Sequence, residues 1–403
     1  MMRIGILGHG FMTWGGGIDF LRAVASSLLQ ADKTIELHVL LPTSGPRLAA
    51  RNALRSSYHG ARALFGRKVA VPQPMDARHI AELANGLESG LALHAIDSGA
   101  AAIARAGRML SLDVVIPAIT PLPTGFPLPW VGYVFDFQHR YLPEHFTSTE
   151  RTQRDVQFSA MLGSARAVIV NARSVAADIA RFHPDASARV FALPFSAAPQ
   201  NVWLQPSESP ARRYGIGIGT SYFIVCNQFW KHKDHATVFA AFAQIASKYP
   251  DVDLVCTGAT DDYRDPDHFA SLRIEIARDK LSDRVHILGM VPKVDQIGLM
   301  KSALALIQPT LFEGGPGGGA VYDAVSLGLR CLVSDIDVNR ELDEPEIEFF
   351  PAGNAAALAE SMRNLLSRRA TPAPNHELLA ARGRARRAAC GAQLLAAINH
   401  VHI

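Results

Sequence analysis

The stretch LFEGGPGGGAVYDAVSLG, residues 311–328, places five glycines and one proline between two acidic residues, Glu313 and Asp323. The apolar run before it, ALALIQP at 303–309, predicts a strand, and the residues after the glycines predict a helix. Glycines let backbone amides approach a ligand closely, and the start of a helix attracts negative charge. The stretch therefore indicates a diphosphate site, with Glu313 accepting from sugar hydroxyls and Asp323 holding a ribose diol. The alternative is a flexible loop with a solvated Glu313 and an Asp323 on the helix surface.

Short apolar runs alternate with longer helical patterns on both sides of this stretch, which predicts parallel sheets covered by helices. The expected strands lie at 3–8, 35–41, 112–118, 130–135, 165–171, 189–195, 222–228, 252–258, 285–291, 303–309 and 330–335. Helical spacing recurs after residue 17, over 234–249 and over 377–401. The pattern predicts two doubly wound, Rossmann-like α/β domains that face each other across a cleft, and ligands of such sheets bind beyond the carboxyl ends of the strands.

The chain of 403 residues is too long for one ordinary core and suits two domains. A segment rich in Pro, Ser and Gly without a period separates the two series of strands. The expected division is a first domain at 1–196, a linker at 197–219, a second domain at 220–374 and a closing helix at 375–403.

The composition, 48% hydrophobic and 19% charged, is that of a soluble globular protein. A net charge of +3 does not suggest nucleic-acid binding. The four cysteines lack the C-x-x-C spacing of a zinc site, and a disulfide framework is disfavoured. The start, MMRIGILGHGF, has no secretion signal, and no apolar run could cross a bilayer. We expect a cytoplasmic protein, with peripheral contact at the inner membrane face left open.

The run ALALIQPTLFEGGPGGGAVYDAVSLGLRCLVSDIDVNRELD, residues 303–343, resembles the retaining family-four glycosyltransferases of the GT-B fold. Their pattern, PSxxEGFGLPxxEAMAxGxPVxxSDxxGxxE, has two glutamates. Glu313 falls on the first of them and Asp323 on the second. This chain has a spacer two residues longer and a shorter second acid. The resemblance implies that the backbone amides of the glycine loop hold the donor diphosphate; these glycines are Gly314, Gly315, Gly317, Gly318 and Gly319.

The segment IVCNQFWKHKDHATVFAAF, residues 224–242, is similar to the family's strand followed by an arginine and a lysine. Lys233 falls on the phosphate-binding lysine. Gln228 stands where the arginine belongs, and Lys231 is a candidate to supply the missing charge. The plain alternative for Lys233 is a solvated charge. The loop after the strand at 285–291 would border the nucleotide base through Met290.

In the first half, the glycines of GHGFMTWGGG, residues 8–17, fail the dinucleotide-binding spacing because Thr13 stands where the third glycine belongs. The triplet Gly15, Gly16 and Gly17 instead resembles the family's Gly-Gly pair near the transferred sugar and diphosphate. The alternative is a tight strand–helix turn.

The segment VGYVFDFQHRYLPEHF, residues 131–146, resembles the family's HDxxxxxxPxxF. Asp136 matches the aspartate, whereas Phe135 replaces the histidine. His139 is then the candidate for contacting the sugar. The alternative is a capping Asp136 and a partly exposed His139.

Arg47, Arg51 and Arg55 recur at helical spacing and form a basic face. Such a face suits an anionic acceptor or a membrane surface, although a solvated helix is the alternative.

The resemblance implies transfer of a hexose from a nucleoside diphosphate sugar to an acceptor hydroxyl, in polysaccharide or glycolipid synthesis. Glu313, Asp136 and His139 are the candidate catalytic residues. We expect no cofactor besides the donor. Three D-x-D strings, at 251–253, 265–267 and 335–337, mimic the metal-binding motif of other glycosyltransferases, but each has a sufficient local explanation, so we expect no metal. A glycan or lipid-linked acceptor is the expected partner; the oligomeric state stays open. The alternatives are a sugar-nucleotide 2-epimerase of the same fold and a non-catalytic sugar-nucleotide-binding protein.

Overall fold

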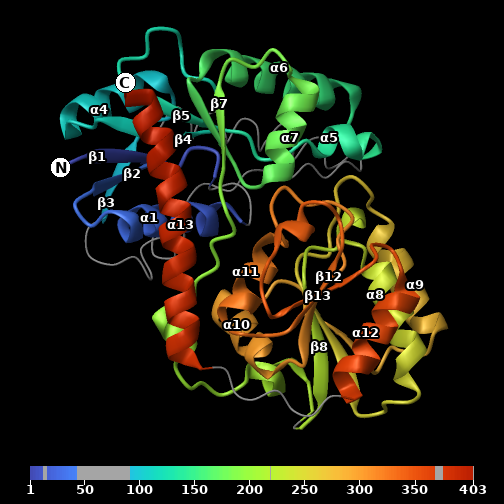
Figure 1. The fold of residues 1–403 in the computed structure, drawn as a ribbon. Coiled ribbons are helices and arrows are strands. Elements are labelled where there is room, and N and C mark those ends of the chain that lie inside the picture. Colours follow the sequence, from blue (N-terminus) through green and yellow to red (C-terminus); the bar gives the residue numbers. More distant parts are fainter. Residues whose placement is uncertain (12–15, 43–90, 218, 368–374, 403) are drawn as a thin grey trace. The chain divides into compact units, whose positions relative to one another are not determined.

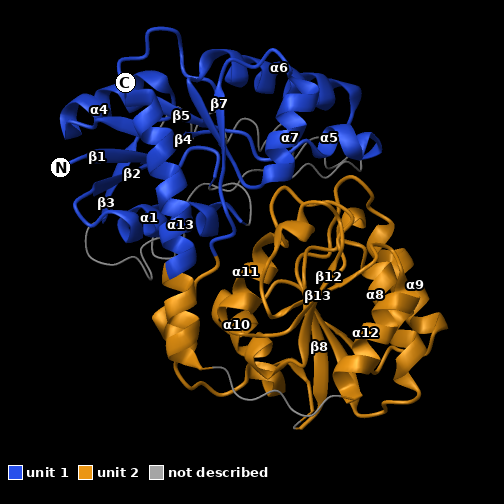
Figure 2. Cartoon of the chain, in the orientation of Figure 1, with its two compact units in different colours: residues 1–196, 385–403 blue, residues 197–384 orange. Residues whose placement is uncertain are grey.

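The computed structural model describes residues 1–11, 16–42, 91–217, 219–367 and 375–402 (Figure 1). The chain divides into two compact units, coloured separately in Figure 2. Unit 1 contains residues 1–196 and 385–403, and unit 2 contains residues 197–384. Each unit is built around its own parallel sheet, so the prediction of two doubly wound α/β domains is confirmed.

Unit 1 holds a seven-stranded sheet in the order β3-β2-β1-β4-β5-β6-β7, with parallel pairing throughout. Its strands are β1 Arg3–Leu7, β2 Glu36–Pro42, β3 Leu91–Ile96, β4 Val114–Ala118, β5 Trp130–Tyr133, β6 Ala167–Val170 and β7 Arg189–Ala192. Its helices are α1 Gly17–Ala31, α4 Ala100–Leu110, α5 Gln138–Tyr141, η1 Pro143–His145, α6 Ser148–Ser164 and α7 Arg173–Phe182.

Both faces of this sheet are covered, which explains why its strands are apolar runs rather than alternating patterns. On one face Ile4 and Ile6 pack with Leu21 of α1. On the other face Leu7 packs with Ile103 of α4. The last helix, α13 His376–His402, shares the first face with α1, and it crosses α1 in Figure 1.

Unit 2 holds a six-stranded sheet in the order β10-β9-β8-β11-β12-β13, also parallel. Its strands are β8 Ser221–Cys226, β9 Val252–Thr257, β10 Val285–Ile287, β11 Ala305–Gln308, β12 Cys331–Ser334 and β13 Ile347–Phe350. Its helices are η2 Asn201–Leu204, η3 Pro210–Tyr214, η4 Lys231–Lys233, α8 His235–Ala246, α9 His268–Arg278, α10 Lys293–Ser302, α11 Gly318–Ser326, η5 Asn339–Glu341 and α12 Ala355–Ser367.

Helices cover both faces of the second sheet too. Phe223 and Val225 of β8 pack with α8 and α12, whereas the Tyr222 hydroxyl donates to Leu299 O of α10 at 2.7 Å. Figure 1 shows α10 and α11 on one side of this sheet and α8, α9 and α12 on the other.

The differences from the sequence prediction lie at sheet edges and at the expected linker. The edge strands β3 and β13 were not among the expected strands, because each mixes polar residues into a short apolar run. Residues 197–219, expected as a linker, belong to unit 2 and contain η2 and η3. The closing helix α13 is shared, since residues up to 384 belong to unit 2 and the rest to unit 1.

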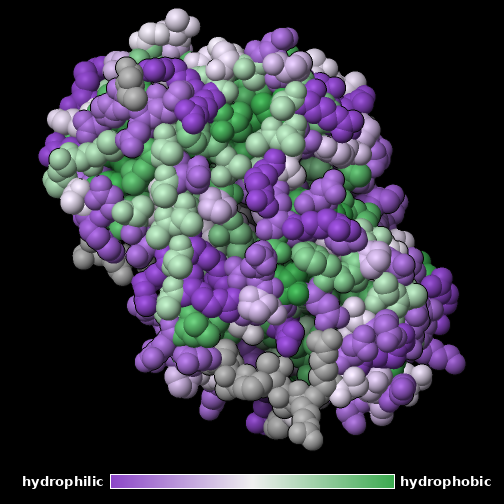
Figure 3. Space-filling view, viewed as in Figure 1, coloured by the Kyte–Doolittle hydropathy of each residue, from purple (hydrophilic) through white to green (hydrophobic). Residues whose placement is uncertain are grey.

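Among the described residues, no helix is long and apolar enough to cross a membrane. On the face shown in Figure 3, hydrophilic residues are interspersed with smaller hydrophobic areas.

Candidate functional site

The strand order of unit 2 locates the point at which ligands of doubly wound sheets bind. The chain adds β9 and β10 on one side of β8 and then returns to add β11, β12 and β13 on the other side. The order therefore reverses between β8 and β11, and the crevice beyond their carboxyl ends is the expected binding place. The loops that follow these two strands, residues 227–234 and 309–317, carry the predicted lysine and the predicted glycine stretch.

Main-chain hydrogen bonds join these two loops. The Leu311 amide donates to His232 O at 2.8 Å, and the Thr310 hydroxyl, which donates to Phe312 O at 2.6 Å, lies 3.3 Å from the same His232 oxygen. As a result Lys233 and Glu313 meet, with Nζ 2.5 Å from Oε1. The two side chains are 14% and 10% exposed, so this is a largely buried ion pair. Lys233 is therefore not a solvated surface charge.

Two amide side chains continue from Glu313 into the sheet. Gln308 Nε2 donates to Glu313 Oε1 at 3.0 Å, and Asn227 Nδ2 donates to Gln308 Oε1 at 2.9 Å. Gln308 is fully buried and Asn227 is 8% exposed. Neither residue is among the predicted site residues. A polar residue at the end of an otherwise apolar strand is the signal that would have found them.

The turn into α11 requires glycine at two positions. Gly317 and Gly318 have φ of +70° and +61°, in the left-handed region that favours glycine. A Cβ on Gly317 would lie 2.5 Å from Val321 Cβ, and a Cβ on Gly318 would lie 3.0 Å from Glu313 Oε1. The Glu313 carboxylate thus rests against the first residue of the helix.

The amides of this turn are not all directed at a ligand. The Gly317 amide donates to the buried Asn339 Oδ1 at 2.8 Å, and Asn339 is held in turn by Ser334. The Gly318 amide points back to Gly315 O at 3.4 Å. The prediction that Gly317 presents its amide to a phosphate is therefore wrong, because a side chain of the protein already caps it.

The next residue, Gly319, faces open space. A Cβ on Gly319 would meet no atom within 4 Å, and this glycine is exposed. Gly319 and Ala320 lie in the first turn of α11, where an α-helix supplies no acceptors for its own amides. Gly314 and Gly315 are half-buried in the loop that leads to this turn.

Asp323 lies on α11 and is 5% exposed. Its Oδ2 accepts from Lys293 Nζ at 2.5 Å and from Gln296 Nε2 at 3.3 Å, both on α10. Its charge also reaches Cys226 at the carboxyl end of β8; burial, with a smaller contribution from Asp323, raises the pKa of Cys226 to about 12. Asp323 thus lies at the same sheet edge as Glu313, but it is engaged in an ion pair.

The remaining predicted donor contacts lie in neighbouring loops. Gln228 is half-buried after β8, where Gly258 of the next loop approaches so closely that a Cβ would lie 2.9 Å from the Gln228 amide nitrogen. Lys231, the candidate for supplying a charge to the diphosphate, has a side chain that is 60% exposed, and its Nζ lies 3.7 Å from Asp265 Oδ2. Met290 is 74% exposed in the loop after β10.

In unit 1 the structure gives structural roles to both predicted catalytic residues. Asp136 Oδ1 accepts from the Gln138 amide at 2.9 Å and from Arg154 at 3.4 Å, so it caps the start of α5. The His139 side chain is 0% exposed, with Nε2 2.8 Å from Asp155 Oδ1. Burial lowers the pKa of His139 although Asp155 favours its charged form. The expected sugar contact of His139 is therefore corrected, because its ring lies in the interior, near those of Phe137, Phe146 and Phe158.

Gly16 caps α1 and Gly17 is its first residue, at the carboxyl end of β1. Gly15, Arg47, Arg51 and Arg55 lie outside the described residues.

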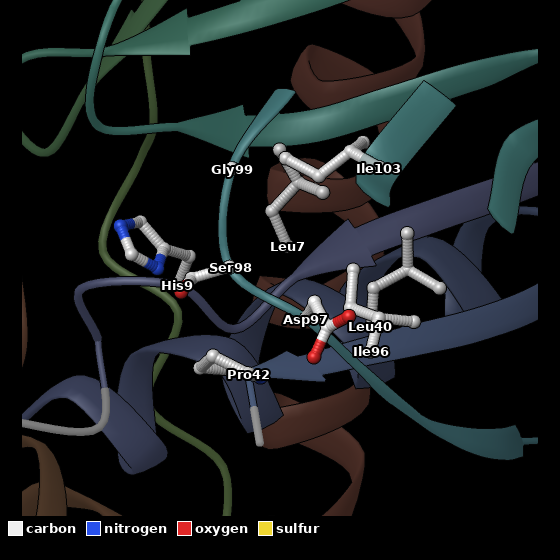
Figure 4. A pocket seen from close by; sticks show the side chains of 9 residues that line it. All are labelled: Leu7, His9, Leu40, Pro42, Ile96, Asp97, Ser98, Gly99 and Ile103. Carbon is white, nitrogen blue, oxygen red and sulfur yellow. The ribbon is translucent and has the colours of Figure 1, made fainter. Parts of the chain in front are cut away.

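A small pocket in unit 1 lies where β1, β2 and β3 end and α4 begins. Figure 4 shows the polar side chains of His9 and Asp97 beside apolar Leu7, Leu40 and Ile103. None of these side chains is among the predicted site residues.

Residues 211–385 match the family described as glycosyl transferases group 1. No curated protein sequence matches the chain. Among solved structures, the chain is similar to sucrose-phosphate synthase from Thermosynechococcus elongatus, with a TM-score of 0.63 and 14% identity over 100% of this chain and 94% of that one. It is similar to Anabaena HepE in complex with UDP and glucose, with a TM-score of 0.58 and 16% identity over 99% and 98%. These likenesses show the GT-B fold.

The outer-core lipopolysaccharide galactosyltransferase WaaB, in its apo form, has a TM-score of 0.56 and 14% identity over 99% of both chains.

Proposed function

We propose that this chain, whose residues 211–385 match the group 1 glycosyl transferases, transfers a sugar from a nucleoside diphosphate sugar to an acceptor hydroxyl with retention of the anomeric configuration. The observation that carries the proposal is the Lys233–Glu313 ion pair, because it lies beyond the switch point of unit 2, where the glycine turn opens α11.

The first chemical demand is stabilisation of the negative charge that grows on the departing diphosphate. The Lys233 ammonium, the Gly319 and Ala320 amides and the positive end of α11 supply it in this proposal. Lys233 shares its charge with Glu313 in the ligand-free chain, so a phosphate would bind beside an ammonium that is already positioned.

The second demand is orientation of the sugar. Glu313 would accept hydrogen bonds from sugar hydroxyls and so direct the anomeric carbon toward the acceptor. On the front face, the acceptor oxygen forms its bond to that carbon as the bond to the diphosphate oxygen breaks, and the leaving phosphate takes the acceptor's proton. Asp323 would accept a hydrogen bond from a ribose hydroxyl while it stays paired with Lys293. The Lys293–Asp323 pair is therefore part of the proposed ribose site.

The substrates are proposed from the relatives. Because HepE has been crystallised with UDP-glucose, UDP-glucose is the first donor to test, and the hexose class follows from it. WaaB acts on lipopolysaccharide outer core, which favours a glycan or lipid-linked acceptor. Peripheral contact with a membrane face rests on the sequence pattern of Arg47, Arg51 and Arg55 alone.

A thermal-shift screen of UDP, GDP and ADP sugars tests the donor. A ligand at 100 times its Kd stabilises the folded chain by about 2.7 kcal/mol. We expect Lys233→Met to abolish the shift given by UDP and its sugars, whereas Lys231→Met, two residues away, retains it. Equal losses in both variants would contradict the assigned phosphate contact.

Product analysis separates the rival functions. Transfer to an added acceptor with retained configuration supports the proposal. Formation of an epimeric donor without an acceptor indicates a 2-epimerase. Binding without transfer, hydrolysis or epimerisation across a panel of acceptors indicates a non-catalytic binding protein.

A further inference from the structure

We propose that Asn227 and Gln308 form an amide relay that positions Glu313, so that Glu313 offers one carboxylate oxygen, Oε2, to the donor sugar. This inference rests on the proposed function, since it assigns Glu313 a sugar contact. It adds two positioning residues and names the atom that meets the substrate.

The relay spans the switch point of the second sheet. Asn227 directly follows β8 and Gln308 is the last residue of β11, and these two strands are hydrogen-bonded neighbours. Asn227 Nδ2 donates to Gln308 Oε1 at 2.9 Å, and Gln308 Nε2 donates to Glu313 Oε1 at 3.0 Å. The relay thus connects two strand ends to the carboxylate of the glycine stretch.

The two hydrogen bonds of Gln308 determine which end of its amide faces Glu313. Because Gln308 Oε1 already accepts from Asn227, the Gln308 amino group is the end that faces Glu313. A flipped Gln308 would set its carbonyl oxygen against the carboxylate. The Glu313 carboxylate can only accept, so it requires the Gln308 amino group, and Asn227 supplies the donor for the Gln308 carbonyl oxygen; the two bonds together hold Gln308 in the orientation that bonds Glu313.

The two oxygens of Glu313 have different surroundings. Oε1 accepts from Lys233 at 2.5 Å and from Gln308 at 3.0 Å, which occupies its acceptor positions. Oε2 receives no hydrogen bond from the residues that the structure describes. Both oxygens lie beside Gly318, where a Cβ would be 3.0 Å from Oε1 and 3.2 Å from Oε2, so the hydrogen bonds alone distinguish them. A sugar hydroxyl would therefore bond to Oε2.

Burying these amides lowers stability relative to apolar side chains at the same positions, which favours a functional reason for the relay. Gln308 is 0% exposed and ends a strand whose other residues are apolar, so an apolar side chain would suit the position by packing alone. A buried amide lowers stability unless both its ends are hydrogen-bonded. Here both ends are bonded, one to the neighbouring strand end and one to Glu313, and that arrangement suits orientation of the carboxylate.

The main test is Gln308→Glu, measured as kcat against pH with UDP-glucose. A protonated Glu at position 308 has almost the shape of Gln and donates an O–H to Glu313, whereas the ionised form repels it. Two adjacent carboxylates hold a shared proton to a raised pKa. We expect kcat at pH 8 to fall at least about tenfold, and to recover to within about threefold of the wild type near pH 5.5, with a smaller change in KM.

Gln308→Leu removes the donor at similar volume and should lower kcat at least about tenfold at every pH. The control is Gln244→Glu, an exposed glutamine on α8 of the same unit that donates to Ala240 O. Its pH profile should match that of the wild type. A purely structural role for Gln308 predicts instead a lowered melting temperature with a pH profile parallel to the wild type.

Two results would overturn the inference: kcat of Gln308→Leu within twofold of the wild type, or no low-pH recovery in Gln308→Glu. If the wild type neither binds nor turns over UDP-glucose or any other sugar nucleotide, the proposed function has failed instead. Crystal structures of both variants at pH 5.5 and pH 8 then decide the relay alone. A displaced Glu313 carboxylate at pH 8 supports it, and an unmoved carboxylate overturns it.

Discussion

Lys233 and Glu313 lie 80 residues apart in the chain and share one largely buried hydrogen bond. Taking two charges out of water is costly, and their attraction offsets that cost only while both partners are present. The presence of this pair is therefore better explained by function than by stability. In the proposed function, a donor phosphate interacts with the same Lys233 ammonium.

Removing one partner of this pair should destabilise the chain more than removing both. We expect Lys233→Met and Glu313→Gln each to lower the free energy of unfolding by about 3 kcal/mol, because each leaves a buried charge uncompensated. The double variant should recover part of that loss. Urea unfolding of the four proteins measures the coupling, and strictly additive losses would show that the two charges do not interact.

His235 is a second buried group, and its protonation state depends on its surroundings. Its ring stacks on Phe229 with centroids 4.0 Å apart, and neither ring nitrogen has a hydrogen-bond partner within the part of the chain that is described. Burial, with smaller contributions from His268 and Lys233, lowers the pKa of His235 to about 3. The histidine is therefore neutral in the folded chain at physiological pH.

This lowered pKa predicts a loss of stability in acid. Below its ordinary pKa of 6.5 the unfolded chain binds a proton at His235, whereas the folded chain does not until about pH 3. The free energy of unfolding should therefore fall as the pH falls from 6.5 toward 3, by at most about 1.4 kcal/mol per pH unit. His235→Phe keeps the ring stacking and should remove this slope. The same change at exposed His376 is the control; an unchanged slope in His235→Phe would contradict the prediction.

At the scale of the element, the start of α11 combines two requirements in adjacent glycines. Gly318 must adopt a left-handed conformation beside the Glu313 carboxylate, whereas Gly319 faces open space in the first helical turn. Gly318 is thus needed for its backbone conformation. Gly319 is needed only if an anion binds beside it.

Alanine at these two positions separates fold from binding. Gly318→Ala should lower the free energy of unfolding by about 1–2 kcal/mol and reduce turnover, because its methyl group meets Glu313 at a positive φ. Gly319→Ala should leave stability unchanged or slightly raised but weaken UDP binding, since its methyl group occupies the proposed phosphate space. Thermal unfolding and calorimetric titration with UDP measure the two effects. Undiminished UDP affinity in Gly319→Ala would contradict the phosphate site.

At the scale of the whole molecule, α13 contributes to both units. Near its start Arg382 forms paired bonds to Glu346 at 2.7 and 2.9 Å and a third bond to Glu344 at 2.6 Å within unit 2. Near its end Leu394 and Ile398 are fully buried in the core of unit 1. The last helix is therefore part of the folded core of unit 1 although the rest of unit 1 ends at residue 196.

Gly391 sets how closely α13 approaches α1. A Cβ at this position would lie 2.0 Å from Ser27 O and 2.7 Å from Ala31 Cβ. Gly391→Ala should therefore lower the free energy of unfolding by about 2–3 kcal/mol, despite the better helix propensity of alanine. Gly163→Ala on α6, where a Cβ meets no atom within 4 Å, should instead gain up to about 1 kcal/mol. Chemical denaturation of both variants tests this; equal effects would mean that α13 does not pack tightly on α1.

The sequence by itself determined the alternation of strands and helices and the doubly wound fold class, and it supplied the residues of the proposed donor site. These features are local, because apolar runs, helical spacing and glycine turns can each be seen within a dozen residues. The edge strands β3 and β13 escaped prediction because a short strand with a polar, half-exposed face has a weak pattern.

Only the tertiary structure decided which polar groups are already engaged. Asn339, 22 residues along the chain, accepts from the Gly317 amide, and Gln308 accepts from Asn227, which is 81 residues away. Asp155 is hydrogen-bonded to His139, whose ring lies in the interior. A residue type shows what a side chain can bond to, but the partner is chosen by the packing of distant segments. For that reason the sequence indicates a candidate site, while the tertiary structure determines which of its amides and carboxylate oxygens are already bonded within the protein.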